Sequence, residues 1–159
     1  MLRAPTVSHS HNGGWPGSAS DFHAHFDWTG TDDPSARLSI PAALAAVAEL
    51  HPDGWPGLMA ANHDLVLAGR DLLCEALGVE RPAPDEMLGS LAAVPIPPAA
   101  GSTSIFDPLT VRLRHDHGIE VPVFTWPEPP ERLLRISAQI YNRIEEYERL
   151  AAVLAAEFG

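Results

Sequence analysis

The decapeptide LLRISAQIYN, residues 133–142, decides the fold prediction because its apolar and polar residues alternate as in a strand that is buried on one face. We expect the buried face to carry Leu134, Ile136, Ala138 and Ile140. The other face would carry Leu133, Arg135, Ser137 and Gln139. A guanidinium on an open strand face can hold a carboxylate or a phosphate through two parallel hydrogen bonds, although an arginine in such a place is usually only solvated.

The segments around this strand predict alternating helices and strands over the second two thirds of the chain. Apolar residues recur at helical spacing over residues 56–77 and again over 143–158, and a third helix is expected over 108–117. Strands are expected at 87–97, 119–124 and 131–141. Helices that cover one face of a mainly antiparallel sheet would satisfy this order of elements.

Turn and capping residues support the boundaries of these helices. Gly78 and Gly118 follow the first two helices at the position where glycine ends a helix. Asp107 before a proline has the pattern of an N-terminal cap, and Asn142 with Glu145 three residues later resembles a capping box.

The first third of the chain shows less regular patterning. Residues 8–34 are rich in Gly, Ser, Asp and His and predict an extended, irregular segment. An alanine-rich helix is expected from Pro34 or Ser35 to Leu50. We therefore divide the chain into residues 1–54 and residues 55–159, and we expect the second part to be the more autonomous one.

Composition limits the classes of partner. The chain has 159 residues, with 21 acidic against 10 basic side chains and a formal charge of -11, which argues against a nucleic acid or an anionic membrane as partner. It has no apolar run near the roughly 20 residues that span a bilayer and no apolar signal core, so a cytoplasmic location is expected. All 10 basic residues are arginines, and the sequence contains no lysine.

Several segments together resemble the C-terminal portion of a pyridoxal-phosphate-dependent (PLP-dependent) class V aminotransferase family protein of fold type I, similar to isopenicillin N epimerase. The segments are DWTGTDDPS at 27–35, NHDLVLAGRDLLCEALGV at 62–79, DPLTVRLRHDHGIEVPVFTW at 107–126, LLRISAQIYN at 133–142 and EEYERL at 145–150. They follow the family's order and spacing, and the RIS…YN element is the most specific of them.

The resemblance implies a truncated PLP-dependent transferase fold of the α/β class, with an α+β small domain. Residues 1–54 would be a remnant of the end of the large cofactor domain. Residues 55–159 would form the long linking helix and the small C-terminal domain, whose mainly antiparallel sheet is covered by helices. The apolar residues Leu38, Ile40 and Leu44 would then have lost their packing partners.

The same resemblance implies the site residues. Arg135 would bind the α-carboxylate of an amino-acid substrate, and Thr31 with Gly30 would contact the phosphate of PLP bound in a neighbouring subunit, which requires a dimer. The family forms a Schiff base between PLP and a lysine, and this chain has no lysine. No catalytic residue is therefore assigned.

The missing lysine leaves the activity open between three hypotheses. In the first, the chain is an aminotransferase or epimerase portion that is catalytic only as part of a longer or complemented assembly, with a homodimer or a complementing large-domain chain as expected partner, and that does not retain PLP alone. Alternatively, it is a non-catalytic remnant that folds and dimerises without cofactor. In the third hypothesis it is a small module that binds an amino acid through Arg135.

Other side chains predict structural roles. Two His-x-His pairs, His9 with His11 and His23 with His25, have a spacing that could bind a metal on a strand, but nothing else of a metal motif accompanies them and no metal site is predicted. Cys74 is expected to be a packed thiol, and Ser137 either contacts a ligand or is satisfied by backbone.

Overall fold

The computed structural model describes residues 20–27, 32–99 and 106–159. The chain divides into two compact units, Met1–Ala45 and Ala46–Gly159, and each is described by itself. The domain boundary expected after residue 54 stays a prediction.

A short helix, α1 (Asp21–Phe26), lies within the segment that we predicted to be irregular, so this part of the prediction is wrong. The side chain of Ser20 accepts a hydrogen bond from the His23 N–H and caps the helix. One turn apart, the rings of Phe22 and Phe26 stack with their centroids 4.7 Å apart. These local contacts stabilise a helix that is too short to show a hydrophobic period.

The helix expected over residues 34–50 is present but interrupted. It consists of α2 (Ser35–Leu38) and α3 (Ile40–Ala48), with a break at Ser39. Pro41 has no N–H to donate to the carbonyl of Arg37, which explains an interruption at this point. No residue of α2 or α3, both fully described, is buried, and the exposed fractions are 74% for Leu38, 53% for Ile40 and 51% for Leu44.

The second unit contains the three longer helices, α4 (Gly54–Leu77), α5 (Pro108–His117) and α6 (Ile144–Phe158). The end of α4 and the cap and end of α5 confirm the predictions from Gly78, Asp107 and Gly118. Gly78 and Gly118 end α4 and α5 with φ angles of 65° and 62°, values that favour glycine. Asp107 caps α5 by accepting a hydrogen bond from the Leu109 N–H.

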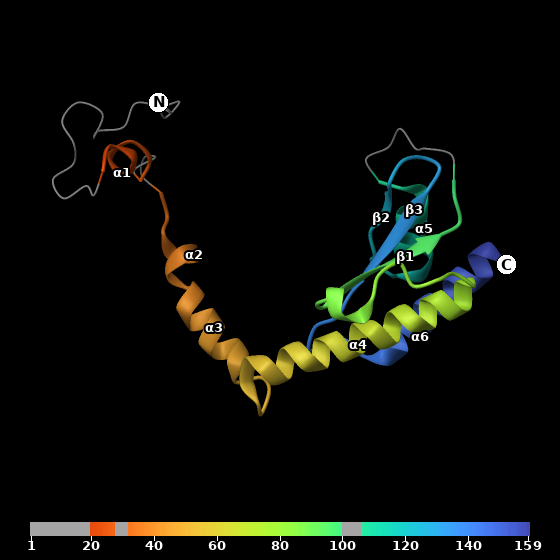
Figure 1. Ribbon diagram of the computed structural model, residues 1–159, viewed down its shortest axis with the longest axis horizontal. Coiled ribbons are helices and arrows are strands. Elements are labelled where there is room, and N and C mark those ends of the chain that lie inside the picture. The colour runs from red at the N-terminus through yellow and green to blue at the C-terminus, as the bar shows by residue number, and fades with distance from the viewer. Residues whose placement is uncertain (1–19, 28–31, 100–105) are drawn as a thin grey trace. The chain divides into compact units, whose positions relative to one another are not determined.

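A three-stranded antiparallel sheet completes this unit. Its strands are β1 (Leu91–Ile96), β2 (Val123–Thr125) and β3 (Arg132–Ser137) in the order β1-β3-β2, and a single 3₁₀ turn, η1 (Asp85–Met87), precedes β1. Helices α4 and α6 run side by side along one face of the sheet (Figure 1). The predicted class, a small antiparallel sheet covered by helices, is confirmed.

The core lies between this covered face and the helices. Ile136 pairs with Ala92 and Leu134 pairs with Val94, so the apolar residues of β1 and β3 share one face. The predicted burial of Leu134, Ile136 and Ala138 is confirmed. The helices contribute Val66, Leu73, Leu109, Leu113, Tyr147, Leu150 and Leu154 to the same cluster.

Strand β3 ends earlier than the alternation predicted. The chain turns after Ala138, and Ile140 is 42% exposed rather than buried. In this turn the Gln139 N–H donates to Asn142 Oδ1 at 3.0 Å, and the Asn142 N–H donates back to the Gln139 carbonyl at 2.8 Å. An Asn side chain that accepts a hydrogen bond from a backbone N–H replaces the hydrogen bond that this N–H would make to a neighbouring strand.

The capping residue of α6 also differs from the prediction. Glu146, and not Glu145, accepts hydrogen bonds at the start of the helix, from the Arg143 N–H at 3.1 Å and from Asn142 Nδ2 at 2.9 Å. The helix begins one residue later than the predicted cap would place it.

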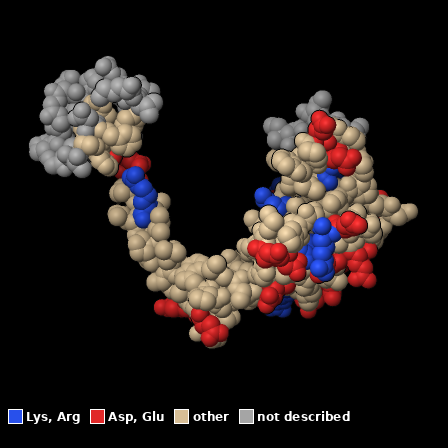
Figure 2. All heavy atoms as spheres, viewed as in Figure 1, with Lys and Arg blue, Asp and Glu red and all other residues tan. Residues whose placement is uncertain are grey.

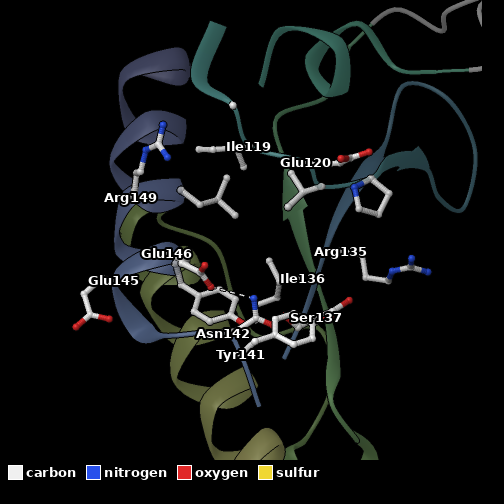
Figure 3. Close-up of a pocket in the computed structure, with 15 residues that line it drawn as sticks. Ile119, Glu120, Arg135, Ile136, Ser137, Tyr141, Asn142, Glu145, Glu146 and Arg149 are labelled. Atoms are coloured by element: carbon white, nitrogen blue, oxygen red, sulfur yellow. Dashed lines mark hydrogen bonds between the residues drawn. The ribbon is translucent and has the colours of Figure 1, made fainter. Parts of the chain in front are cut away.

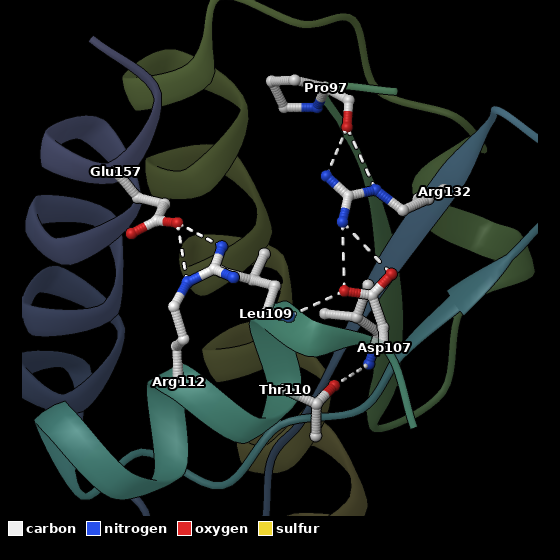
Figure 4. Close-up of polar contacts among 8 residues, drawn as sticks. Pro97, Asp107, Leu109, Thr110, Arg112, Arg132 and Glu157 are labelled. Carbon is white, nitrogen blue, oxygen red and sulfur yellow. Dashed lines mark hydrogen bonds and ion pairs between the residues drawn. The ribbon is translucent and has the colours of Figure 1, made fainter. Parts of the chain in front are cut away.

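A buried arginine ties three elements together (Figure 4). Nη1 of Arg132 donates to both carboxylate oxygens of Asp107, at 3.0 and 3.1 Å, and Nε and Nη2 donate to the carbonyl of Pro97 at 3.1 and 2.7 Å. The start of β3 is thereby fixed to the residue after β1 and to the cap of α5.

A second buried arginine joins α4 to the 3₁₀ turn. Arg70 is 1% exposed and donates hydrogen bonds to Asp71 on the same helix and to Asp85 in η1, the latter at 2.7 Å.

The exposed surface carries charges of both signs, because arginines lie among acidic side chains on the face shown in Figure 2. Among the described helices, none is both long and apolar enough to cross a membrane.

Candidate functional site

A pocket of about 480 Å³ lies where β2 and β3 separate (Figure 3). Three segments line it: residues 118–122 before β2, residues 135–137 of β3, and the turn and first turns of α6 from Tyr141 to Leu150. It thus combines a strand edge, a loop and a helix face, and its volume falls in the range that binds small ligands.

Arg135 stands at the rim of this pocket. It is exposed on the open face of β3, as the alternation predicted, and its backbone N–H donates to the Pro122 carbonyl at 3.0 Å. Its side chain extends to the side of β3 opposite α6 (Figure 3). Within the described residues the guanidinium makes no hydrogen bond or ion pair, so its donors are available to an anion.

Tyr147 and Ser137 form the inner wall. The Tyr147 hydroxyl donates to the Ser137 carbonyl at 2.6 Å. Burial raises the pKa of Tyr147, and the negative charge of Glu146 adds to this effect, so the hydroxyl remains a donor at neutral pH. The ring of Tyr147 lies against α4 at Gly69, which leaves room for it.

Polar residues hold the lower edge of the pocket. Hydrogen bonds from the Asn142 side chain and the Arg143 backbone lower the pKa of Glu146, which is therefore a carboxylate at neutral pH. Asn62 of α4 donates to Gln139 Oε1 at 3.0 Å and joins the turn after β3 to the long helix.

The other predicted site residues are not brought to this pocket. Thr31 and Gly30 lie outside the described residues, and their contact with a phosphate stays a prediction. His23 and His25 lie on α1, where residues two apart point to different sides of the helix. In the described part of the chain, no three His, Cys, Asp or Glu side chains are grouped as a metal ion would require. Cys74 is buried, and burial raises the pKa of its thiol.

Comparison with known proteins identifies relatives over nearly the whole chain. No family model matches the sequence. The chain is 32% identical over 157 residues to a protein of Arabidopsis thaliana named probable L-cysteine desulfhydrase, chloroplastic, covering 94% of this chain and 31% of that protein. It is 33% identical over 132 residues to isopenicillin N epimerase of Streptomyces clavuligerus, covering 82% of this chain and 31% of that enzyme. The resemblance to a class V aminotransferase family protein is confirmed.

The match to this family is partial in length. The chain spans about a third of the length of the curated relatives it matches, and a putative L-cysteine desulfhydrase of Oryza sativa subsp. japonica is covered to 33% at 32% identity. This coverage fits the predicted C-terminal portion of a class V protein.

The family resemblance implies PLP in the full-length relatives, but the residues of this chain do not fit its covalent attachment. None of the 159 residues is a lysine, and the guanidinium groups of the arginines are protonated and poorly nucleophilic. The described residues include a group that suits an anion, because the guanidinium of Arg135 at the rim of the pocket has free donors.

Proposed function

We propose that this chain is the carboxylate-binding part of a PLP-dependent class V enzyme that acts on an amino acid. The observation that carries the proposal is Arg135, whose guanidinium has no partner among the described residues and which lies on a strand that is hydrogen-bonded on both sides. Because the strand is fixed, the backbone that carries Arg135 does not have to be ordered when the planar guanidinium binds a carboxylate.

The remaining parts of the proposal concern what completes the site. Activity requires a lysine from a longer or complemented assembly, because these 159 residues contain none. Thr31 and Gly30 would contact the cofactor phosphate of a neighbouring subunit in a homodimer, and the chain alone would be inactive. The partners would be an amino acid and a protein chain, and the location cytoplasmic.

A non-catalytic amino-acid-binding module is the second candidate. The absence of lysine favours it, and it uses Arg135 in the same way. Both candidates bind a carboxylate through Arg135. Only the first predicts that a complemented assembly turns over an amino acid.

The experiment compares L-alanine and L-alaninamide as ligands of the purified chain by NMR titration. We expect L-alanine to bind and Arg135→Lys to weaken its binding by roughly 10-fold or more, since a charged hydrogen-bonding partner contributes about 1.5 to 3 kcal/mol. L-alaninamide, which lacks the carboxylate, should bind weakly to both proteins.

Arg37→Lys is the matched control, because Arg37 is exposed, pairs with Asp32 and does not line the pocket. Its affinity for L-alanine should equal that of the unsubstituted chain. Equal affinity of Arg135→Lys and the unsubstituted chain would remove Arg135 from the site.

A further inference from the structure

The face of the sheet that α4 and α6 leave open carries a row of apolar side chains next to Arg135. In the strand register, Leu133 of β3 has Pro95 of β1 on one side and Phe124 of β2 on the other, so the three side chains lie across the sheet on one face. Arg135 is on the same face, two residues or roughly 7 Å further along β3. We call Pro95, Leu133 and Phe124 the apolar row.

The apolar row is accessible to a ligand. Phe124 is 38% exposed and the other two members are half-buried, whereas Val94 and Leu134, which point to the covered face, are 0% exposed. The side chain of Arg135 extends to the side of β3 opposite α6, which is the side of the apolar row (Figure 3). A ligand that binds the guanidinium therefore lies on the same side of the sheet as the row.

The charge of this open face favours an anion. Within the ladders, the described residues that face this side are Leu91, Ala93, Pro95, Phe124, Leu133, Arg135 and Ser137. Among them Arg135 alone is charged. Glu120, from the loop before β2, pairs with Arg114 at 3.8 Å. A ligand that brings its own carboxylate therefore complements this face.

A small ligand suits the face better than a protein surface does. An isologous dimer through this face would bring two identical surfaces together, and neither would supply an acid to the Arg135 of the other copy. A stable interface takes roughly 20 to 30 residues a side, whereas the row consists of Pro95, Leu133 and Phe124. Three apolar side chains on adjacent strands match one ring or one alkyl chain.

We propose that the apolar row binds the side chain of the amino acid whose carboxylate contacts Arg135, and that the substrate class is amino acids with a large apolar side chain, such as phenylalanine. This inference rests on the proposed function, because Arg135 is the carboxylate contact in both. A benzyl group on the α-carbon reaches away from the carboxylate toward the row and buries apolar surface there. The methyl group of alanine ends next to the carboxylate.

The test compares L-phenylalanine with L-alanine as ligands of the purified chain in NMR titrations. We expect L-phenylalanine to bind roughly 10-fold more tightly, because its ring buries apolar surface that a methyl group does not. The amide signals of Phe124 and Leu133 should shift more with L-phenylalanine than with L-alanine. These shifts need no variant and locate the ring directly.

Phe124→Thr removes the ring from the apolar row and keeps a residue type that favours strands. It should reduce the ratio of the two affinities from roughly 10 to roughly 3 or less, whereas Phe124→Leu, which keeps an apolar side chain, should retain most of the ratio. Phe22→Ala is the matched control, since Phe22 is also exposed but lies on α1 and not on the sheet. Its ratio should equal that of the unsubstituted chain.

The outcomes separate the two proposals. Equal affinities for the two amino acids, both weakened by Arg135→Lys, overturn the side-chain inference and leave the proposed function standing. A ratio that Phe124→Thr does not change overturns the contact with the apolar row, and a dimer that Phe124→Thr dissociates would assign the row to a second copy instead. Binding of L-phenylalanine that Arg135→Lys does not change overturns the carboxylate contact and with it both proposals, as does the absence of binding by both amino acids.

Discussion

At Gly69 the backbone of α4 approaches the ring of Tyr147 more closely than any side chain would allow. A Cβ atom at this position would lie 2.8 Å from Cγ and 2.9 Å from Cδ1 of Tyr147. The ring is held in place, because its hydroxyl donates to the Ser137 carbonyl in the pocket wall. The absence of a Cβ atom at Gly69 therefore allows the Tyr147 ring, which lines the pocket, to lie in this position.

We expect Gly69→Ala to destabilise the chain although alanine is the better helix former. Overpacking costs about 1 to 3 kcal/mol, and the gain in helix propensity of up to about 1 kcal/mol offsets only part of it. The free energy of unfolding in urea is the measurement.

Gly89→Ala is the control, since nothing lies within 4 Å of the Cβ position at Gly89. Adding Tyr147→Leu to Gly69→Ala should relieve the clash, so the double variant should lose less than the sum of both single losses. An unchanged midpoint in Gly69→Ala would contradict the close contact.

The two arginines of β3 show which residue roles a sequence can predict. The alternation of apolar and polar residues predicted that Arg135 lies on the open face, because the face on which a strand residue lies follows from the two-residue period alone. The same period places Arg132 on the buried face together with Leu134, so the burial of Arg132 follows from the sequence as well. Its carboxylate partner Asp107 lies 25 residues away, and no local pattern connects the two.

At the scale of elements, helices with glycine stops were predicted well and the ends of strands were not. Gly78 and Gly118 end helices through their own backbone conformation, which the residue type encodes. The end of β3 depends on hydrogen bonds between Gln139, Asn142 and Asn62, the last of which comes from another element. Such tertiary contacts override the alternation that continues through Ile140.

Arg132 joins the start of β3 to Pro97 after β1 and to Asp107 before α5. We therefore expect Arg132→Met to destabilise the second unit. Removing one partner of a buried ion pair costs about 3 to 5 kcal/mol, since the other charge stays buried without compensation. The side chains of Arg132 and Asp107 are 9% and 13% exposed. Circular dichroism during urea unfolding measures the loss.

Arg112→Met is the comparison, because Arg112 pairs with Glu157 at a more exposed place and should lose no more than about 1 kcal/mol. Adding Asp107→Asn to Arg132→Met removes the remaining charge and should recover part of the stability. If Arg132→Met and Arg112→Met lose equal amounts, the buried network does not hold β3 in place.

At the scale of the whole molecule, the chain spans about a third of the length of its relatives and contains no lysine that could anchor PLP covalently. A Schiff base requires an amine, and the side chains of this chain offer only guanidinium groups. Noncovalent retention would depend on phosphate contacts. We therefore expect that the chain, mixed with PLP and dialysed, shows no protein-bound cofactor absorbance and no adduct after reduction with borohydride except at the α-amino terminus.

The control is the same chain with Ala93→Lys, which places an amine on β1 directly opposite Arg135 in the sheet register. This variant should give a reduced adduct whose mass maps to the new lysine, which shows that the assay detects attachment. The unsubstituted chain should give only the terminal adduct, whose yield is independent of Arg135. A stoichiometric adduct elsewhere in the unsubstituted chain, or amino-acid turnover that Arg135→Ala abolishes, would show that residues 1–159 hold a complete site. The proposal that activity requires a lysine from outside these residues would then be wrong, whereas the carboxylate contact of Arg135 would stand if Arg135→Ala abolishes turnover.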